Sequence, residues 1–220
     1  MMAVFEKCER LRHIGHLDIQ RTMQRALRRS GLPVSYSKGF NPHILVTFAS
    51  ALSTGAIGER EIMDVTLDQE VTAEAFVAAM NAALPPDMQL SCAKPMDDRH
   101  PALMAMLHAV DYSIRIMDDE AAKKMVEAIP GLMQQESIMT LRKSKSGMKE
   151  VDMKPLVYAL AGEENVLHAT LSQAEGNACK PDMLVNALAA FAGIEAPRCI
   201  VTRKQLLGLQ DGQMVPLETL

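Results

Sequence analysis

The residues best suited to binding lie in one short polar turn. The stretch VSYSKGFNPHILVTF, residues 34–48, gathers serine, tyrosine, lysine, asparagine and histidine around Gly39 and Pro42. The turn itself needs only one or two polar residues, because glycine supplies positive φ and Asn-Pro disfavours helix. The surplus donors indicate either an ordinary solvated loop or a surface that presents hydrogen-bond donors to an anion.

An arginine-rich segment precedes this turn. With about 100° of rotation per residue, residues 16–30 form an amphipathic helix whose apolar stripe is Ile19, Met23, Ala26 and Leu27. The opposite face carries an arginine ridge, defined as Arg21, Arg25, Arg28 and Arg29. Only Asp18 offers a local salt-bridge partner on that helix. The ridge is either a solvated face or a phosphate site, for which the guanidinium group is well shaped.

Charge is segregated along the chain. The net charge is −4, yet residues 1–50 carry eight Lys and Arg against three Asp and Glu, and the other 170 residues carry 15 against 24. A general nucleic-acid binder would be basic throughout. The pattern favours a localised anionic partner.

The elements that position these residues follow one order twice. In the first half the order is strand, helix, strand, strand, helix, strand, at residues 2–9, 16–30, 44–49, 60–67, 72–84 and 88–93. Thr72 caps the second helix and Pro85-Pro86 stops it. In the second half the same order falls at residues 112–116, 119–129, 138–142, 165–172, 181–192 and 198–203. Residues 143–164 are too long for a simple hairpin and are predicted to hold a short helix at 155–160.

The expected fold class is therefore α+β, with two tandem ferredoxin-like β-α-β-β-α-β sandwiches. The expected domains are residues 1–97 and 108–220, joined by a charged, proline-containing linker at 98–107. In the first sandwich the end of the arginine helix leads into the polar turn. The ridge and the turn are expected at one edge of that domain.

Cysteine spacing and hydropathy limit the function classes. Cys8, Cys92, Cys179 and Cys199 are far apart and form no cluster motif, so no metal, iron–sulfur cluster or other cofactor is expected, and they are interpreted as small buried residues. No stretch approaches 20 apolar residues, and the N-terminus lacks the order of a signal peptide. A soluble cytoplasmic protein with no membrane contact is expected.

Several motifs together resemble one bacterial family. They are LRHIGHLDIQRTMQRALRRSGLPVSYSKGFNPHILVTFASAL, then EREIMDVTL, and SKSGMKEVDMKPLVYAL in the second half. The chain is similar over nearly its whole length to the radical SAM-linked protein family, a domain of unknown function. In that family the domain is fused behind a radical SAM domain or stands alone, encoded near ribosomal-protein genes. The three-cysteine cluster motif of the radical SAM domain is absent here. The resemblance therefore implies that this chain is the stand-alone form.

Two departures from the family pattern affect the site. Gly15 stands where the family usually has the serine of a capping box, so capping is weakened by a few tenths of a kcal/mol. After His43 the family often has proline and a basic residue, whereas this chain has Ile44 and Leu45. A phosphate contact at that point is therefore not expected.

The resemblance and the basic edge together predict an accessory RNA-binding protein that presents ribosomal or transfer RNA to a separate radical SAM enzyme. We assign no enzymatic activity to the chain by itself. The expected RNA-binding residues are Arg12, His16, Arg21, Arg25, Arg28, Arg29, Tyr36, Ser37, Lys38, Asn41 and His43. Basic residues of the second half are expected to extend the track, namely Arg142, Lys143, Lys145, Lys149 and Lys154. Tyr36, Phe40 and Phe48 are the only base-stacking candidates near the turn, so recognition is expected mainly of backbone and shape.

Two alternatives remain open. A metal-independent endoribonuclease of the CRISPR repeat-processing type would use His13 or His16 as general base or acid. A protein-interaction module would use the 17 methionines on adaptable surfaces. His16 and His43 are expected to face the same cleft, and we predict that they bind RNA as donors and cleave nothing.

Overall fold

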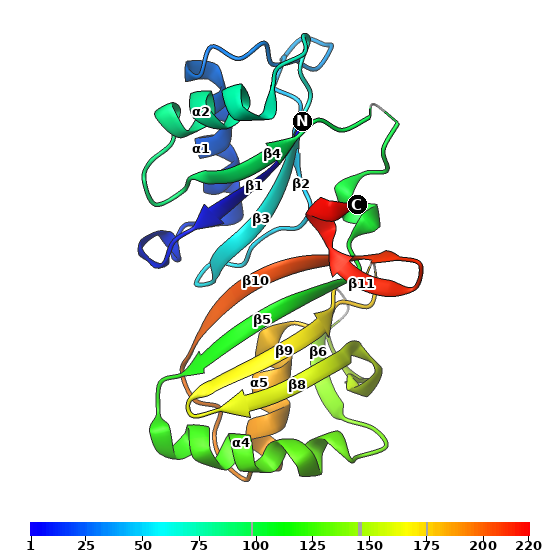
Figure 1. Ribbon diagram of the computed structural model, residues 1–220. Coiled ribbons are helices and arrows are strands. Elements are labelled where there is room, and N and C mark those ends of the chain that lie inside the picture. Colours follow the sequence, from blue (N-terminus) through cyan, green and yellow to red (C-terminus); the bar gives the residue numbers. More distant parts are fainter. Residues whose placement is uncertain (98, 145–146, 175) are drawn as a thin grey trace. The chain divides into compact units, whose positions relative to one another are not determined.

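The structure is a computed structural model that describes residues 1–97, 99–144, 147–174 and 176–220 (Figure 1). It is an α+β protein with five α-helices and eleven strands in the described residues. The chain folds as two units: residues 1–107 with 205–220 form the first, and residues 108–204 form the second. Within the described ranges no helix is long and apolar enough to cross a membrane.

The first unit repeats the order expected from the sequence. Its main elements are β1 (Met2–Lys7), α1 (His16–Arg29), β2 (Val46–Phe48), β3 (Ile57–Val65), α2 (Ala73–Ala83) and β4 (Leu90–Lys94). The strands pair in the order β4-β1-β3-β2, and every pair is antiparallel. A short 3-10 helix, η1 (Glu9–Leu11), follows β1.

Helices α1 and α2 lie together on one face of this sheet (Figure 1). The core between them contains the expected stripe of α1, Phe76 and Met80 of α2, and Phe5 and Met63 of the sheet. Thr72 caps α2, since its hydroxyl accepts a hydrogen bond from the backbone N–H of Ala75 at 3.2 Å. The predicted helix positions and this cap are confirmed.

Two segments of the first unit differ from the sequence-based expectation. The predicted linker contains α3 (Leu103–Met106), because its apolar residues Leu103 and Leu107 are buried. Residues 205–220, expected in the second domain, belong to the first unit. The cause is β10 (Cys199–Gln210), a 12-residue strand that leaves the second unit and continues into the first. An Asp211-Gly212 turn then returns the chain along β10 as β11 (Gln213–Pro216), before η3 (Leu217–Thr219).

The second unit has a sheet and a separate hairpin. Its elements before β10 are β5 (Ala109–Ile116), α4 (Asp119–Met133), β6 (Met139–Ser144), β7 (Gly147–Asp152), η2 (Lys154–Leu156), β8 (Val157–Glu163), β9 (Val166–Ser172) and α5 (Pro181–Phe191). Strands pair antiparallel in the order β5-β9-β8, while β6 and β7 pair with each other as a separate two-stranded sheet.

Three expectations for the second unit are corrected. The strand expected at 138–142 belongs to the β6–β7 hairpin and not to the sheet. The short helix expected at 155–160 is wrong: Pro155 starts only a 3-10 turn, and the apolar run after it forms β8. Helix α4 continues through Pro130 to Met133, because burial of Leu132 holds a further turn.

Candidate nucleic-acid interface

The arginine ridge lies on the solvent face of α1. All four of its side chains are exposed, whereas the opposite stripe is buried. The helix ends cleanly after Arg29: the Ser30 hydroxyl donates to the carbonyl oxygen of Leu27 at 2.8 Å, and Gly31 adopts φ +73°. Arg28 and Arg29 therefore occupy the last turn of α1, at the end from which the polar turn departs.

The arginines differ in what they already bind. Arg12 pairs with Glu9 at 2.9 Å, and Arg21 pairs with Asp18 at 3.0 Å. Arg29 donates to the carbonyl oxygen of Ala83 at 2.7 Å, where it caps the C-terminus of α2.

Arg25 and Arg28 make no ion pair or hydrogen bond with any residue that the structure describes. Their spacing of three residues places their Cβ atoms about 5–6 Å apart on one face of the helix. They are the two ridge cations available to an outside anion.

The polar turn is a closed loop with an exposed tip; we call residues 34–45 the loop. Its neck is held by backbone hydrogen bonds from Leu45 N to Ser35 O at 2.9 Å and from Ser37 N to His43 O at 2.8 Å. The Ser37 hydroxyl also meets His43 Nδ1 at 2.8 Å and accepts from His43 N at 3.1 Å. Ser37 and His43 are thus used inside the loop.

The base of the loop is tied to the segment that follows β3. The backbone N–H of Ser35 donates to Thr66 O at 2.9 Å, and the Ser35 hydroxyl donates to the Asp68 carboxylate. The Asp68 carboxylate beside the neck is therefore already hydrogen-bonded. The tip, from Lys38 to Pro42, is exposed along its whole length, and Tyr36 at the neck is 46 % exposed.

The two motif histidines have different neighbours. His16 starts α1, and its half-buried ring contacts Phe48 edge-on with centroids 5.4 Å apart. His43 lies in the loop, which follows the C-terminal end of α1 in the chain, and its ring meets the Ser37 hydroxyl. From His16 to Arg28 the helix rises about 18 Å. The shared cleft stays a prediction, because this rise separates the two ends of α1 and does not measure the distance between the two rings.

The geometry supports binding of phosphate more than chemistry on it. Arg25, Arg28 and Lys38 are exposed cations of the first unit without a partner among the described residues.

Two features of this region were not predicted from the sequence. Phe48 was grouped with Phe40 as a stacking candidate, but its ring packs against Phe5 with centroids 5.9 Å apart. Lys7 is buried, although a lysine is expected to be exposed.

Basic residues of the second unit are used in different ways. On the β6–β7 hairpin, Arg142 and Lys149 face each other across the strands, and Arg142 donates to Gly176 O at 3.3 Å. Lys154 donates to Met133 O at the end of α4, and Asp152 accepts from the backbone N–H groups of Ile138 and Lys154. Lys145 and the side chain of Lys143 lie outside the described residues. The predicted basic track across both halves stays a prediction.

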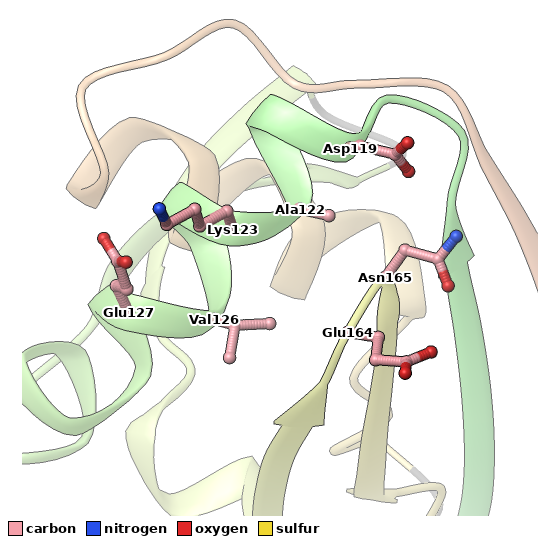
Figure 2. Close-up of a pocket in the computed structure, with 7 residues that line it drawn as sticks. All are labelled: Asp119, Ala122, Lys123, Val126, Glu127, Glu164 and Asn165. Carbon is pink, nitrogen blue, oxygen red and sulfur yellow. The ribbon is translucent and has the colours of Figure 1, made fainter.

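A separate pocket of about 470 Å³ lies in the second unit between α4 and the β8–β9 turn (Figure 2). Lys123 and Glu127 stand on one side of it, and Asp119, Glu164 and Asn165 on the other. Three carboxylates against one ammonium make its lining acidic. That charge repels a nucleic-acid backbone, and none of the predicted site residues lies there.

The four cysteines are free thiols with different environments. Cys179 is buried, Cys8 and Cys199 are partly buried, and Cys92 is exposed, which corrects the expectation that all four are buried. Burial raises the pKa of Cys179 from its ordinary value of 9.0 to about 11, and burial also raises the pKa of Cys199. These two thiols are held in the protonated, unreactive form at neutral pH.

Comparison with known proteins gives one family. A search of curated proteins finds no match. The family model described as "Uncharacterized protein conserved in bacteria (DUF2344)" matches residues 1–181, which include α1, the loop and the β6–β7 hairpin. The chain belongs to this bacterial family of uncharacterized proteins.

Proposed function

We propose that this chain is an accessory RNA-binding protein whose first unit binds the phosphate backbone through the arginine ridge and the loop. The observation that carries the proposal is the pair Arg25 and Arg28, which are exposed on one face of α1 and have no partner among the described residues. Guanidinium groups at this spacing contact adjacent phosphates without displacing an internal ion pair.

The proposed partners follow from the sequence motifs. The resemblance to the radical SAM-linked family supports ribosomal or transfer RNA as substrate and a separate radical SAM enzyme as partner. We interpret the strand order β4-β1-β3-β2 of the first unit as a ferredoxin-like sandwich, and the second unit as a similar sandwich interrupted by the β6–β7 hairpin. In this interpretation the sheet and α2 support α1 and the loop.

Protein binding at the β6–β7 hairpin is a second candidate function. Met139 and Leu141 alternate on one face of β6, and Met148 stands opposite position 143 on that same face. Their side chains are 51 %, 60 % and 60 % exposed. Apolar groups gathered on an exposed hairpin favour a protein contact, which we assign to the partner enzyme. Replacing Leu141 and Met148 by lysine is expected to abolish co-purification with that enzyme and to leave RNA binding intact.

The nuclease alternative gains nothing from the site. A general base needs to reach the nucleophile, and the ring of His16 packs on Phe48 at the end of α1 away from the loop.

Crosslinking of RNA in cells, followed by sequencing, tests the proposal. The variant Arg25→Glu/Arg28→Glu is expected to recover little RNA, and its exposed sites leave the fold intact. The matched control is Lys123→Glu/Lys124→Glu on the exposed face of α4, which changes net charge equally. Recovery by the ridge variant equal to that of the wild type would overturn the proposal, as would equal losses in both variants.

A further inference from the structure

The tip of the loop carries a phenylalanine that none of the described residues buries. Phe40 is 105 % exposed, whereas Phe5 and Phe76 are 2 % and 0 % exposed. Phenylalanine is among the residues most often buried, because covering its ring removes a large apolar area from water. No packing role in the described structure accounts for an aromatic ring at this position.

The backbone holds this ring away from the first unit. Gly39 adopts φ +143°, a conformation that side chains rarely allow, and Asn41-Pro42 turns the chain back on the other side of Phe40. Below the tip, the hydrogen bonds between Ser37 and His43 close the neck. A ring presented on a closed neck loses little conformational freedom when it binds.

The neighbouring side chains indicate what the ring meets. Lys38 is exposed two residues before Phe40, and the Asn41 amide is exposed one residue after it. Tyr36 adds a second half-exposed ring at the neck. An aromatic face, a cation and an amide are the groups with which proteins stack an unpaired base, neutralise its phosphate and bind its edge. A pocket of a protein partner would explain the ring but not the cations of the loop and the ridge.

We infer that Phe40 stacks on an unpaired base, so the RNA bound by this protein carries a bulge, loop or single-stranded segment where it meets the loop. This inference rests on the proposed function and narrows its substrate class. It sharpens the expectation from the sequence, in which recognition was mainly of backbone and shape and Phe40 was one of three base-stacking candidates. In this arrangement the ridge binds the flanking backbone and Phe40 selects the unpaired position.

Two RNAs and four proteins test the inference. The RNAs are a perfect duplex and the same duplex with one bulged 2-aminopurine, whose fluorescence falls when an aromatic ring stacks on it. The proteins are the wild type, Phe40→Ala, Phe40→Tyr and Arg25→Glu/Arg28→Glu. The wild type is expected to prefer the bulged RNA and to quench the probe. Phe40→Ala is expected to lose the quenching and about 5- to 100-fold of affinity for the bulged RNA, with duplex affinity unchanged. Phe40→Tyr, which keeps a ring, is expected to retain both properties.

The outcomes separate this inference from the proposed function. If the wild type binds neither RNA, the proposed function fails and the inference with it. Suppose instead that the wild type binds both RNAs and that Arg25→Glu/Arg28→Glu has lost affinity for both. Unchanged affinity and quenching in Phe40→Ala would then overturn the inference, assign the ring to a protein partner and leave the proposed function standing. Equal losses of Phe40→Ala on both RNAs would also overturn it, because they show a general effect on the loop.

Discussion

The two ends of α1 use their polar groups in opposite ways. Before the helix, the buried Lys7 donates to the carbonyl oxygens of Arg12 and Ile14 at 2.9 and 3.1 Å, and the ring of His16 packs on Phe48. After the helix, the loop closes its own neck and leaves Lys38, Phe40 and Asn41 exposed. The first end is therefore part of the core of the unit, and the second end is exposed, which is why we propose it as the binding surface.

This difference shows why residue type alone misleads. His16 and His43 belong to one continuous family motif, and Phe40 and Phe48 lie in the same segment, residues 34–48. The structure assigns one member of each pair to internal packing and the other to the loop. Substitutions at the two ends are therefore expected to affect different properties: stability before α1, and binding after it.

The largest effect on stability is expected at Lys7. Lys7→Met keeps the length of the side chain but removes the donor to two backbone carbonyl oxygens. The Ile14 carbonyl oxygen then loses its donor, whereas the Arg12 carbonyl oxygen still accepts from the backbone N–H of Gly55 at 2.7 Å. The expected loss in the free energy of unfolding, measured by urea denaturation, is therefore about 1–3 kcal/mol. The matched control is Lys38→Met at the exposed tip, which is expected to cost less than about 0.5 kcal/mol. Similar losses in both variants would remove the distinction between the two ends.

A smaller, local effect is expected at the neck of the loop. Ser37→Ala removes the hydroxyl that contacts His43 Nδ1 and accepts from His43 N. The loss is about 1 kcal/mol and lowers hydrogen-exchange protection of the Ser37 and His43 amides about fivefold. Amides of the α1 interior serve as the control and are expected to keep their protection. Protection lost equally throughout α1 would mean that the loop is not an independent surface.

A stabilising change is expected at Gly15, the residue before α1. A Cβ at Gly15 would lie 3.4 Å from Thr54 Oγ1, an ordinary contact, and its φ of −75° suits any residue. Gly15→Ser supplies a capping oxygen and is expected to add a few tenths of a kcal/mol, roughly 0.3, to the free energy of unfolding. Gly15→Ala adds the same Cβ without an acceptor and is expected to add nothing. Equal thermal midpoints for the serine and alanine variants would contradict capping.

The smallest effect is expected at Cys8, which precedes the turn before α1. Burial, followed by the nearby Glu6 carboxylate, raises the pKa of Cys8 above its ordinary value of 9.0. The folded protein keeps this proton after the unfolded chain has lost it, so the contribution to stability is present below pH 9 and declines as pH rises beyond it. Alkylation at pH 8 is expected to modify the exposed Cys92 before Cys8. Modification of Cys8 before Cys92 would show that the segment before α1 is accessible to solvent, which would contradict its assignment to the core.

Local signals in the sequence predicted much of the fold. The apolar stripe placed α1, Thr72 placed the start of α2, and Pro85-Pro86 placed its end. These features depend on neighbouring residues only. The path of β10 into the first unit and the β6–β7 hairpin depend on pairing between distant segments, which no local pattern encodes.

The candidate site was predictable in its charges but not in its geometry. Helical spacing placed the ridge on the exposed face of α1. It did not show that Arg29 caps α2 or that Ser37 is used by His43, because both interactions join residues whose separation is set by the tertiary fold and the closure of the loop. The exposure of Phe40 also contradicts the usual behaviour of its residue type.

The salt dependence of RNA affinity tests the central claim most directly. For a structured RNA and purified protein, log affinity is expected to fall linearly with log salt concentration. In Arg25→Glu/Arg28→Glu the slope is expected to become shallower by about two, one for each phosphate that the variant no longer neutralises. Lys123→Glu/Lys124→Glu is expected to keep the wild-type slope. A slope unchanged in the ridge variant, or wild-type protein with no measurable affinity, would contradict the assignment of this end of α1 to RNA.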